Sequence, residues 1–137
     1  MRTNTKNGFI RIELLILIIV LILSIAVFLL AFARARVEAH DQHRLSDVGQ
    51  IQKALQVYFG ENAIYPRSTS NQPADFKNYL DFWPAPPPAD GKCTQDQNQY
   101  NYSQKAQGAD YTVTFCLGAR SGSFAPGFYI INSKGSQ

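Results

Sequence analysis

Apolar residues dominate one stretch near the start of the chain. From Ile12 to Ala33 nearly every residue is apolar, and Glu13 and Ser24 are the only polar exceptions. An apolar run of about 20 residues is long enough to cross the hydrocarbon core of a bilayer as a helix. The run therefore predicts a membrane-spanning segment ahead of an otherwise polar chain.

The pattern after Ala33 is amphipathic. Apolar residues recur mostly at steps of three and four, which is the spacing of one helix face. We therefore expect one continuous helix from about residue 10 to residue 59, with Gly60 as its C-cap. The apolar positions of the second half are Val37, Leu45, Val48, Ile51, Leu55 and Tyr58.

The last third of the chain has the pattern of strands. A strand is expected to begin at residues 100–102, and residues 128–131 form another short apolar run. Between them residues 111–117 alternate, with Tyr111, Val113, Phe115 and Leu117 on one face. We expect a three-stranded antiparallel meander that covers residues 48–58 of the helix, and an irregular stretch at residues 68–72. The fold class is α+β, with one small head.

Composition narrows the classes of function. The 137 residues suffice for one small domain, and the net charge of +3 is too small to indicate nucleic-acid binding by itself. No nucleophile–base pair, zinc cluster or phosphate loop is apparent, so we expect neither an enzyme nor a cofactor or metal. His40 and His43 are three residues apart on the expected helix, and we interpret them as exposed side chains rather than as metal ligands.

Three interpretations compete for the apolar run. A secretory signal peptide fits the basic residues before it and the Ala31-Phe32-Ala33 sequence, but its apolar region is usually only about 7–15 residues long. A plain N-terminal anchor leaves Glu13 unexplained unless the carboxylate lies at the headgroup level. An unpaired carboxylate inside lipid is costly, and such residues usually have a function.

The third interpretation rests on residues 8–13, Gly-Phe-Ile-Arg-Ile-Glu, which follow a short leader with Arg2 and Lys6. Together with the apolar run, this segment resembles the processing motif of type IV prepilins. The resemblance implies cleavage between Gly8 and Phe9 by a prepilin peptidase and N-methylation of Phe9. Glu13 becomes the fifth residue of the mature chain, and its carboxylate is expected to pair with the N-terminal amine of a neighbouring subunit.

The resemblance also implies an organisation and a set of partners. Residues 1–8 are a cleaved leader, 9–33 the membrane and filament-core half of the helix, 34–59 its amphipathic half, and 60–137 the head. The expected partners are identical or related pilin subunits, the peptidase, an inner-membrane assembly platform and membrane lipid. The head lies outside the cytoplasm, first on a single-pass protein and then on an extracellular filament. The alternative is a membrane-anchored extracytoplasmic binding module that does not polymerise.

Two further features belong to this interpretation. Position 11 is Arg, where pilins usually have an apolar residue. Cys93 and Cys116 both lie in the head, and an exported domain is compatible with a disulfide between them. Such a bridge would tie the loop after the prolines of residues 84–88 to the strand at residues 111–117.

Overall fold

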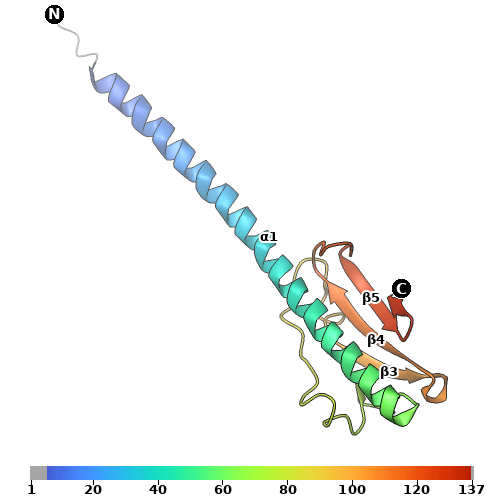
Figure 1. The fold of residues 1–137 in the computed structure, drawn as a ribbon. Helices are drawn as coiled ribbons and strands as arrows, with labels where there is room; N and C mark the ends of the chain where they lie inside the picture. Colours follow the sequence, from blue (N-terminus) through green and yellow to red (C-terminus); the bar gives the residue numbers. More distant parts are fainter. Residues whose placement is uncertain (1–5, 137) are drawn as a thin grey trace, which may run out of the picture. The chain divides into compact units, whose positions relative to one another are not determined.

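A computed structural model describes the backbone of residues 6–136 and the side chains of residues 11–135. The chain separates into two compact units, Met1–Arg36 and Val37–Gln137. Of the described residues, 6–36 in the first unit are helical, and the second unit contains the end of the helix and the described strands (Figure 1). The fold is α+β, as expected.

The helix α1 runs from Lys6 to Asn62, so it is longer at both ends than the expected 10–59. The expectation that Gly60 caps the helix is wrong, because Gly60 lies inside it. The first residue after the helix is Ala63, which takes the left-handed conformation (φ 57°) at a cost of about 1–2 kcal/mol. Its amide donates to the Phe59 carbonyl at 2.8 Å, and the Asn62 side-chain amide donates to the Tyr58 carbonyl at 2.9 Å. The first bond satisfies one of the last four carbonyls of the helix, and the left-handed residue that follows the helix is an alanine rather than a glycine.

The main sheet of the head has four antiparallel strands in the order β3-β4-β5-β6. The expected meander is confirmed in its first three strands. The fourth strand was not expected, because it is only two residues long and pairs with the end of β5 across residues 133–134. The strands are β3 (Asn101–Lys105), β4 (Asp110–Leu117), β5 (Gly127–Asn132) and β6 (Gly135–Ser136), with a 3-10 turn, η1 (Ala106–Gly108), between β3 and β4.

A small hairpin covers the outer edge of β3. It consists of β1 (Ser68–Thr69) and β2 (Gln72–Pro73), where an irregular stretch was expected. The amide of Tyr102 donates to the Asn71 carbonyl at 2.8 Å, and the amide of Gln104 donates to the Ser68 hydroxyl at 2.6 Å. These bonds satisfy amides that an edge strand would otherwise expose.

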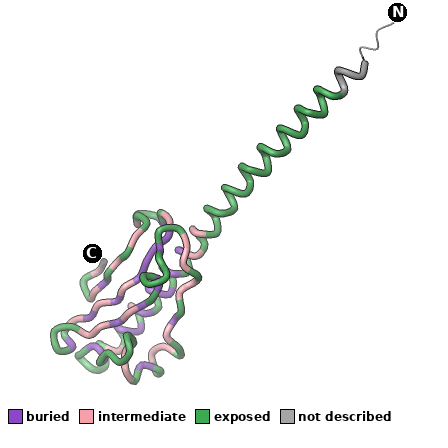
Figure 2. Tube along the Cα trace, turned by 180° about the vertical axis from the view of Figure 1, so that it is seen from behind, coloured by how far each residue is buried: buried purple, intermediate pink, exposed green. Residues whose placement is uncertain are grey.

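The core lies between β4 and the last turns of α1. Val48, Ile51 and Leu55 on the helix are at most 4% exposed, and together with the alternating residues of β4 they belong to one apolar cluster. Figure 2 shows the buried segments gathered where this part of the helix faces the sheet. The predicted faces are confirmed, since Tyr111, Val113, Phe115 and Leu117 are all at most 2% exposed.

A disulfide joins Cys93 to Cys116, as expected, over a sequence separation of 23 residues. It connects the loop that follows the prolines to the end of β4. Closing a loop of this length stabilises the head by about 3 kcal/mol if the effect is mainly on the entropy of the unfolded chain.

The raised pKa values of three core tyrosines predict that the head loses stability at alkaline pH. Burial raises the pKa of Tyr100 and Tyr102, and it raises the pKa of Tyr111 to about 12. Above pH about 10 the unfolded chain releases these phenolic protons while the folded chain keeps them. The stabilisation is therefore complete below pH 10 and declines above it, by up to about 1.4 kcal/mol per pH unit for each tyrosine.

The measurement is denaturant unfolding of the detergent-solubilised chain, followed by Trp83 fluorescence between pH 9 and pH 11. Tyr111→Phe is expected to lose less free energy of unfolding over this interval than the wild-type chain loses. An equal loss in both proteins would mean that Tyr111 does not contribute to the pH dependence.

Candidate functional site

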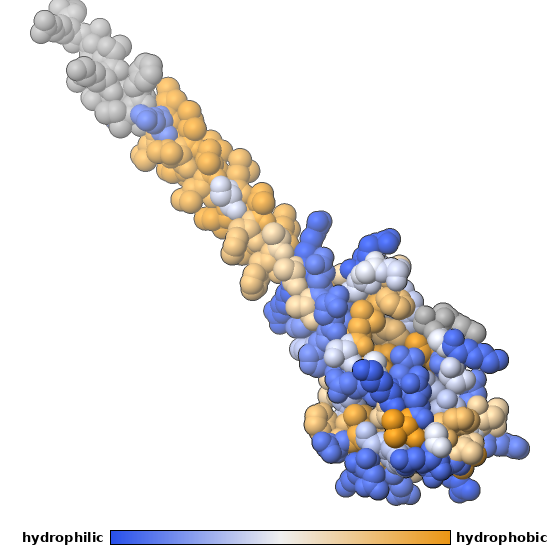
Figure 3. All heavy atoms as spheres, in the orientation of Figure 1, coloured by the Kyte–Doolittle hydropathy of each residue, from blue (hydrophilic) through white to orange (hydrophobic). Residues whose placement is uncertain are grey.

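The most unusual surface of the molecule is the apolar part of α1. Every large apolar side chain from Ile12 to Phe32 is exposed, and even the most covered of them, Ile19, is 47% exposed. On the face of the helix seen in Figure 3, this surface is apolar over nearly its whole length. The helix is long and apolar enough to cross a membrane. Soluble monomers rarely expose so large a contiguous apolar area, which indicates that lipid or protein covers it.

Two polar side chains interrupt this surface in different ways. The Ser24 hydroxyl donates to the Val20 carbonyl at 2.8 Å, so its polarity is satisfied within the helix. The Glu13 side chain is exposed among the apolar side chains of Ile12, Leu14 and Leu15. No ion pair to Glu13 is found among the side chains that the structure describes, residues 11–135.

At the expected cleavage position the structure describes the backbone but not the side chains. Gly8 and Phe9 fall within the helical backbone of α1. Their side-chain surroundings lie outside the described residues, so cleavage and methylation at this position stay predictions. Arg11, the departure from the family pattern, is exposed.

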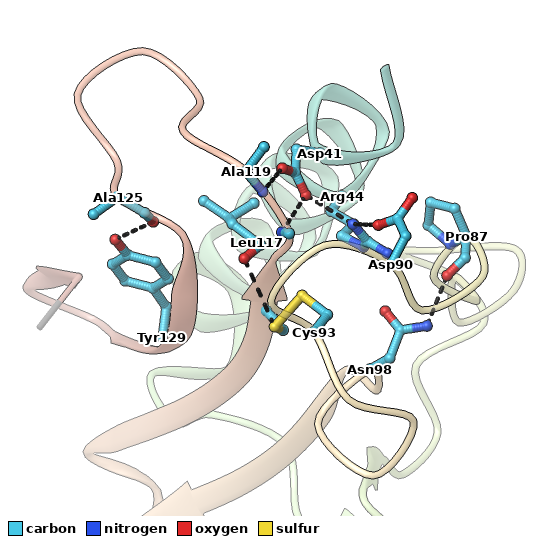
Figure 4. Close-up of a disulfide and its surroundings, with 12 residues drawn as sticks. Asp41, Arg44, Pro87, Asp90, Cys93, Asn98, Leu117, Ala119, Ala125 and Tyr129 are labelled. Atoms are coloured by element: carbon cyan, nitrogen blue, oxygen red, sulfur yellow. Dashed lines mark hydrogen bonds and ion pairs between the residues drawn. A yellow bond between two sulfur atoms is a disulfide. The ribbon is translucent and has the colours of Figure 1, made fainter. Parts of the chain in front are cut away.

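The second unit, Val37–Gln137, is called the head from here on. Its most highly buried charged side chains belong to a cluster that the sequence analysis did not predict. Asp41 and Arg44 on α1 are both fully buried. Arg44 Nη1 donates to Asp41 Oδ1 at 2.7 Å and to Asp90 Oδ1 at 3.0 Å, and its Nη2 donates to the Pro88 carbonyl at 2.8 Å (Figure 4). One guanidinium thus joins the helix to the proline-rich loop.

Asp41 extends the same cluster to the sheet. Its carboxylate accepts the amide of Gly118 at 2.8 Å and the amide of Ala119 at 2.7 Å, directly after β4 (Figure 4). The carboxylate therefore has a cation on one side and two backbone donors on the other, which offsets its loss of hydration. The helix, the loop and the sheet meet at this one group.

The histidines take part in neighbouring pairs. His40, expected to be exposed, is half-buried, and its Nδ1 contacts Asp90 Oδ2. His43 is exposed and its Nδ1 lies 3.1 Å from Asp47 Oδ2. The same Asp47 oxygen accepts the hydroxyl of Tyr100 at 2.9 Å. The His40–Asp90 pair joins α1 to the loop after the prolines, whereas the His43–Asp47 pair lies within α1.

A close backbone approach fixes the loop beside this cluster. A Cβ on Gly91 would lie 2.2 Å from the Gly118 carbonyl oxygen, and Gly91 also has a left-handed φ of +57°. Gly122 has nearly the same φ, +59°, but a Cβ there would meet nothing within 4 Å. A side chain at Gly91 therefore causes both steric overlap and backbone strain, whereas a side chain at Gly122 causes backbone strain alone.

We expect Gly91→Ala to destabilise the head more than Gly122→Ala does. Both variants carry the strain of a left-handed alanine, about 1 kcal/mol. Only Gly91→Ala also forces the loop away from the end of β4, which adds about 1–3 kcal/mol. Denaturant unfolding of both variants measures the difference. Equal losses in the free energy of unfolding would show that the loop at Gly91 moves away from the end of β4 without destabilising the head.

The head also has a hollow on the segment between β2 and β3. It is lined by the apolar residues Phe76, Leu80, Phe82 and Trp83 and by the charged residues Asp75, Lys77 and Asp81. Phe82 is 76% exposed. A hollow with aromatic and charged lining can accept a ligand, although its lining does not single out one chemistry.

Comparison with known proteins adds no assignment to these sites. No family model matches the chain, and no curated protein or solved structure matches it.

Proposed function

We propose that this chain is a structural subunit, a pilin or pseudopilin, of a type IV pilus-like filament. The observation that carries the proposal is the exposed apolar surface of α1 from Ile12 to Phe32, with Glu13 at its head. In a filament subunit such an apolar surface lies in lipid before assembly and packs against other copies of the chain afterwards.

Residues 8–13 support the same proposal. A prepilin peptidase cuts between Gly8 and Phe9 and methylates the new amine of Phe9. The basic leader, with Arg2 and Lys6, stays on the cytoplasmic side of the membrane. An inner-membrane assembly platform then extracts the subunit from the bilayer into the filament.

Glu13 gives the apolar segment its assembly chemistry. In lipid an unpaired carboxylate is unfavourable, and in a filament it can pair with the amine of Phe9 on a neighbouring subunit. This pairing fixes the axial position of one copy relative to the next. Because the carboxylate is unpaired in lipid and paired in the filament, the pairing also favours transfer of the subunit from the bilayer to the filament.

The head supports export rather than cytosolic residence. Its disulfide between Cys93 and Cys116 is of the kind that persists in oxidising compartments. The buried cluster of Asp41 and Arg44 and the disulfide act together to hold a small core. A small head with few buried residues gains most from such links.

The experiment that tests polymer formation is mechanical shearing of intact cells, followed by sedimentation of the released material at high speed. We expect the chain to sediment as a polymer without membrane lipid. A chain that stays entirely with the membrane fraction would favour a different function, an anchored binding module whose head uses the hollow beside Trp83.

A further inference from the structure

Arg11 and Glu13 are separated by two residues on α1, and both side chains are exposed. Two helical residues correspond to a rotation of about 200° and a rise of about 3 Å. The cation and the carboxylate therefore lie on opposite sides of the helix and cannot meet within one copy. Among residues 11–135, whose side chains are described, no ion pair includes either group.

This arrangement has a consequence for contacts between copies. A helix with a positive charge on one side and a negative charge on the other is complementary to a second copy placed beside it in the same orientation. The front of one copy meets the back of the next, so the contact is heterologous. Heterologous contacts between identical chains generate rings or open helical polymers.

We propose that Arg11 of one subunit binds Glu13 of the next subunit. The proposal rests on the proposed function, because it requires that copies pack through this part of α1. A guanidinium presents two parallel N–H groups to a carboxylate, which suits a contact surrounded by apolar side chains. The apolar neighbours Ile12 and Leu14 exclude water from the pair once two copies meet.

The pair is compatible with the contact expected for the N-terminal amine. Phe9 precedes Glu13 by four residues, so the amine formed by cleavage belongs to the same side of its own helix as Glu13, whereas Arg11 belongs to the opposite side. A carboxylate has two oxygens and accepts several donors. Glu13 can therefore accept the amine from one direction and Arg11 from another.

A second copy supplies a partner to both charges, whereas a lipid phosphate supplies a partner to one. Lipid phosphates can bind Arg11 at the edge of the bilayer, but an anion cannot pair with the Glu13 carboxylate. Charge complementarity thus favours another copy of the chain as the occupant of this surface. The lipid alternative predicts a different result in the test below.

The test uses cells that produce the full-length chain as Arg11→Leu, as Glu13→Leu, or as both variants together. Sheared polymer is measured relative to the amount of processed chain, and copies are also cross-linked chemically in isolated membranes. We expect each single variant to lower polymer yield at least about tenfold, because Arg11→Leu removes one of the two cations that bind Glu13, and Glu13→Leu leaves both cations without a carboxylate. Processing is monitored by intact mass.

Co-production is the discriminating arm. In an alternating mixed polymer, Arg11 of the Glu13→Leu chain can bind Glu13 of the Arg11→Leu chain, so every Arg11 has a carboxylate partner, although the Phe9 amines that face the new leucine of the Glu13→Leu chain have none. We expect the Glu13→Leu chain to enter the mixed polymer at least about tenfold more than it polymerises alone, with cross-links between the two variants. Such a gain corresponds to restoration of one buried pair.

The outcomes separate the inference from the proposed function. Arg11→Leu yielding as much polymer as the wild-type chain would overturn the inference and favour lipid phosphates, and so would a mixture in which the Glu13→Leu chain enters no more polymer than it forms alone. In either case the wild-type polymer itself would leave the proposed function intact. If the wild-type chain forms no polymer and no cross-links, both fail together.

Discussion

Replacement of Glu13 by Ala is expected to abolish polymer formation while leaving the head folded. In the proposed filament the variant leaves the amine of Phe9 on a neighbouring subunit, and Arg11 of another, without their carboxylate. A buried charge deprived of its partner destabilises its site by about 3–5 kcal/mol. Since every 1.4 kcal/mol is a factor of ten in an equilibrium constant, polymer yield should fall more than about 100-fold.

The measurement is the sheared, sedimented fraction of Glu13→Ala compared with its membrane fraction. Ser24→Ala is the matched control, because Ser24 is the other polar residue of the apolar run and its hydroxyl donates to the carbonyl of Val20 within the same helix. We expect Ser24→Ala to form polymer normally. Equal effects of the two variants would show that the run tolerates or rejects any change, and that the carboxylate has no special role.

Replacement of Arg44 by Ala is expected to have the largest effect on the stability of the head. The guanidinium contacts Asp41, Asp90 and the carbonyl of Pro88, and its loss leaves a fully buried carboxylate at Asp41 without a cation. The backbone amides of Gly118 and Ala119 remain, so the carboxylate keeps part of its stabilisation. We expect a loss of about 3–5 kcal/mol in the free energy of unfolding.

The loss is measured by denaturant unfolding of the solubilised chain with Trp83 fluorescence as the signal. Arg120→Ala is the control, because Arg120 directly follows Gly118 and Ala119 at the end of β4 but is exposed. Its effect should stay within about 0.5 kcal/mol. An Arg44→Ala protein as stable as Arg120→Ala would mean that the buried cluster contributes nothing to the fold.

The sequence predicted the helix and the sheet because their periodicities are strong. The alternation of residues 111–117 identified the buried face of β4 correctly. The ends of α1 were less well predicted, because Asn62 and Ala63 terminate it through their own hydrogen bonds and no glycine is involved. The strand β6 is too short to produce any periodicity, and it is defined by its pairing with β5.

The buried cluster was missed because charged residues are ordinarily assigned to the solvent side of a helix. A signal was nevertheless present. Asp41 and Arg44 occupy the gap in the apolar stripe between Val37 and Leu45, and the series Val37, Asp41, Arg44, Val48 has steps of four, three and four. Two opposite charges that take the place of apolar residues on a packed face indicate a buried ion pair. Their third partner, Asp90, lies 46 residues from Arg44, and no local pattern could place it there.

The candidate assembly segment is the reverse case. Its composition and the motif at residues 8–13 are local, so the sequence alone suggested the membrane span, the cleavage position and Glu13. The spacing of Arg11 and Glu13 on a helix already excludes a pair within one copy, and the structure adds that the large apolar side chains of this segment are left uncovered. What covers them is decided between chains, which neither the sequence pattern nor the fold of one chain contains.

The most direct test of the central proposal is the N-terminal sequence and intact mass of the protein recovered from its native cells. We predict a chain that begins at Phe9 and carries one added methyl group on its amine. A chain that begins near Arg34 would contradict the proposal, since it would be a secreted head without its assembly segment. An intact chain beginning at Met1 would also contradict it and would favour a plain membrane anchor.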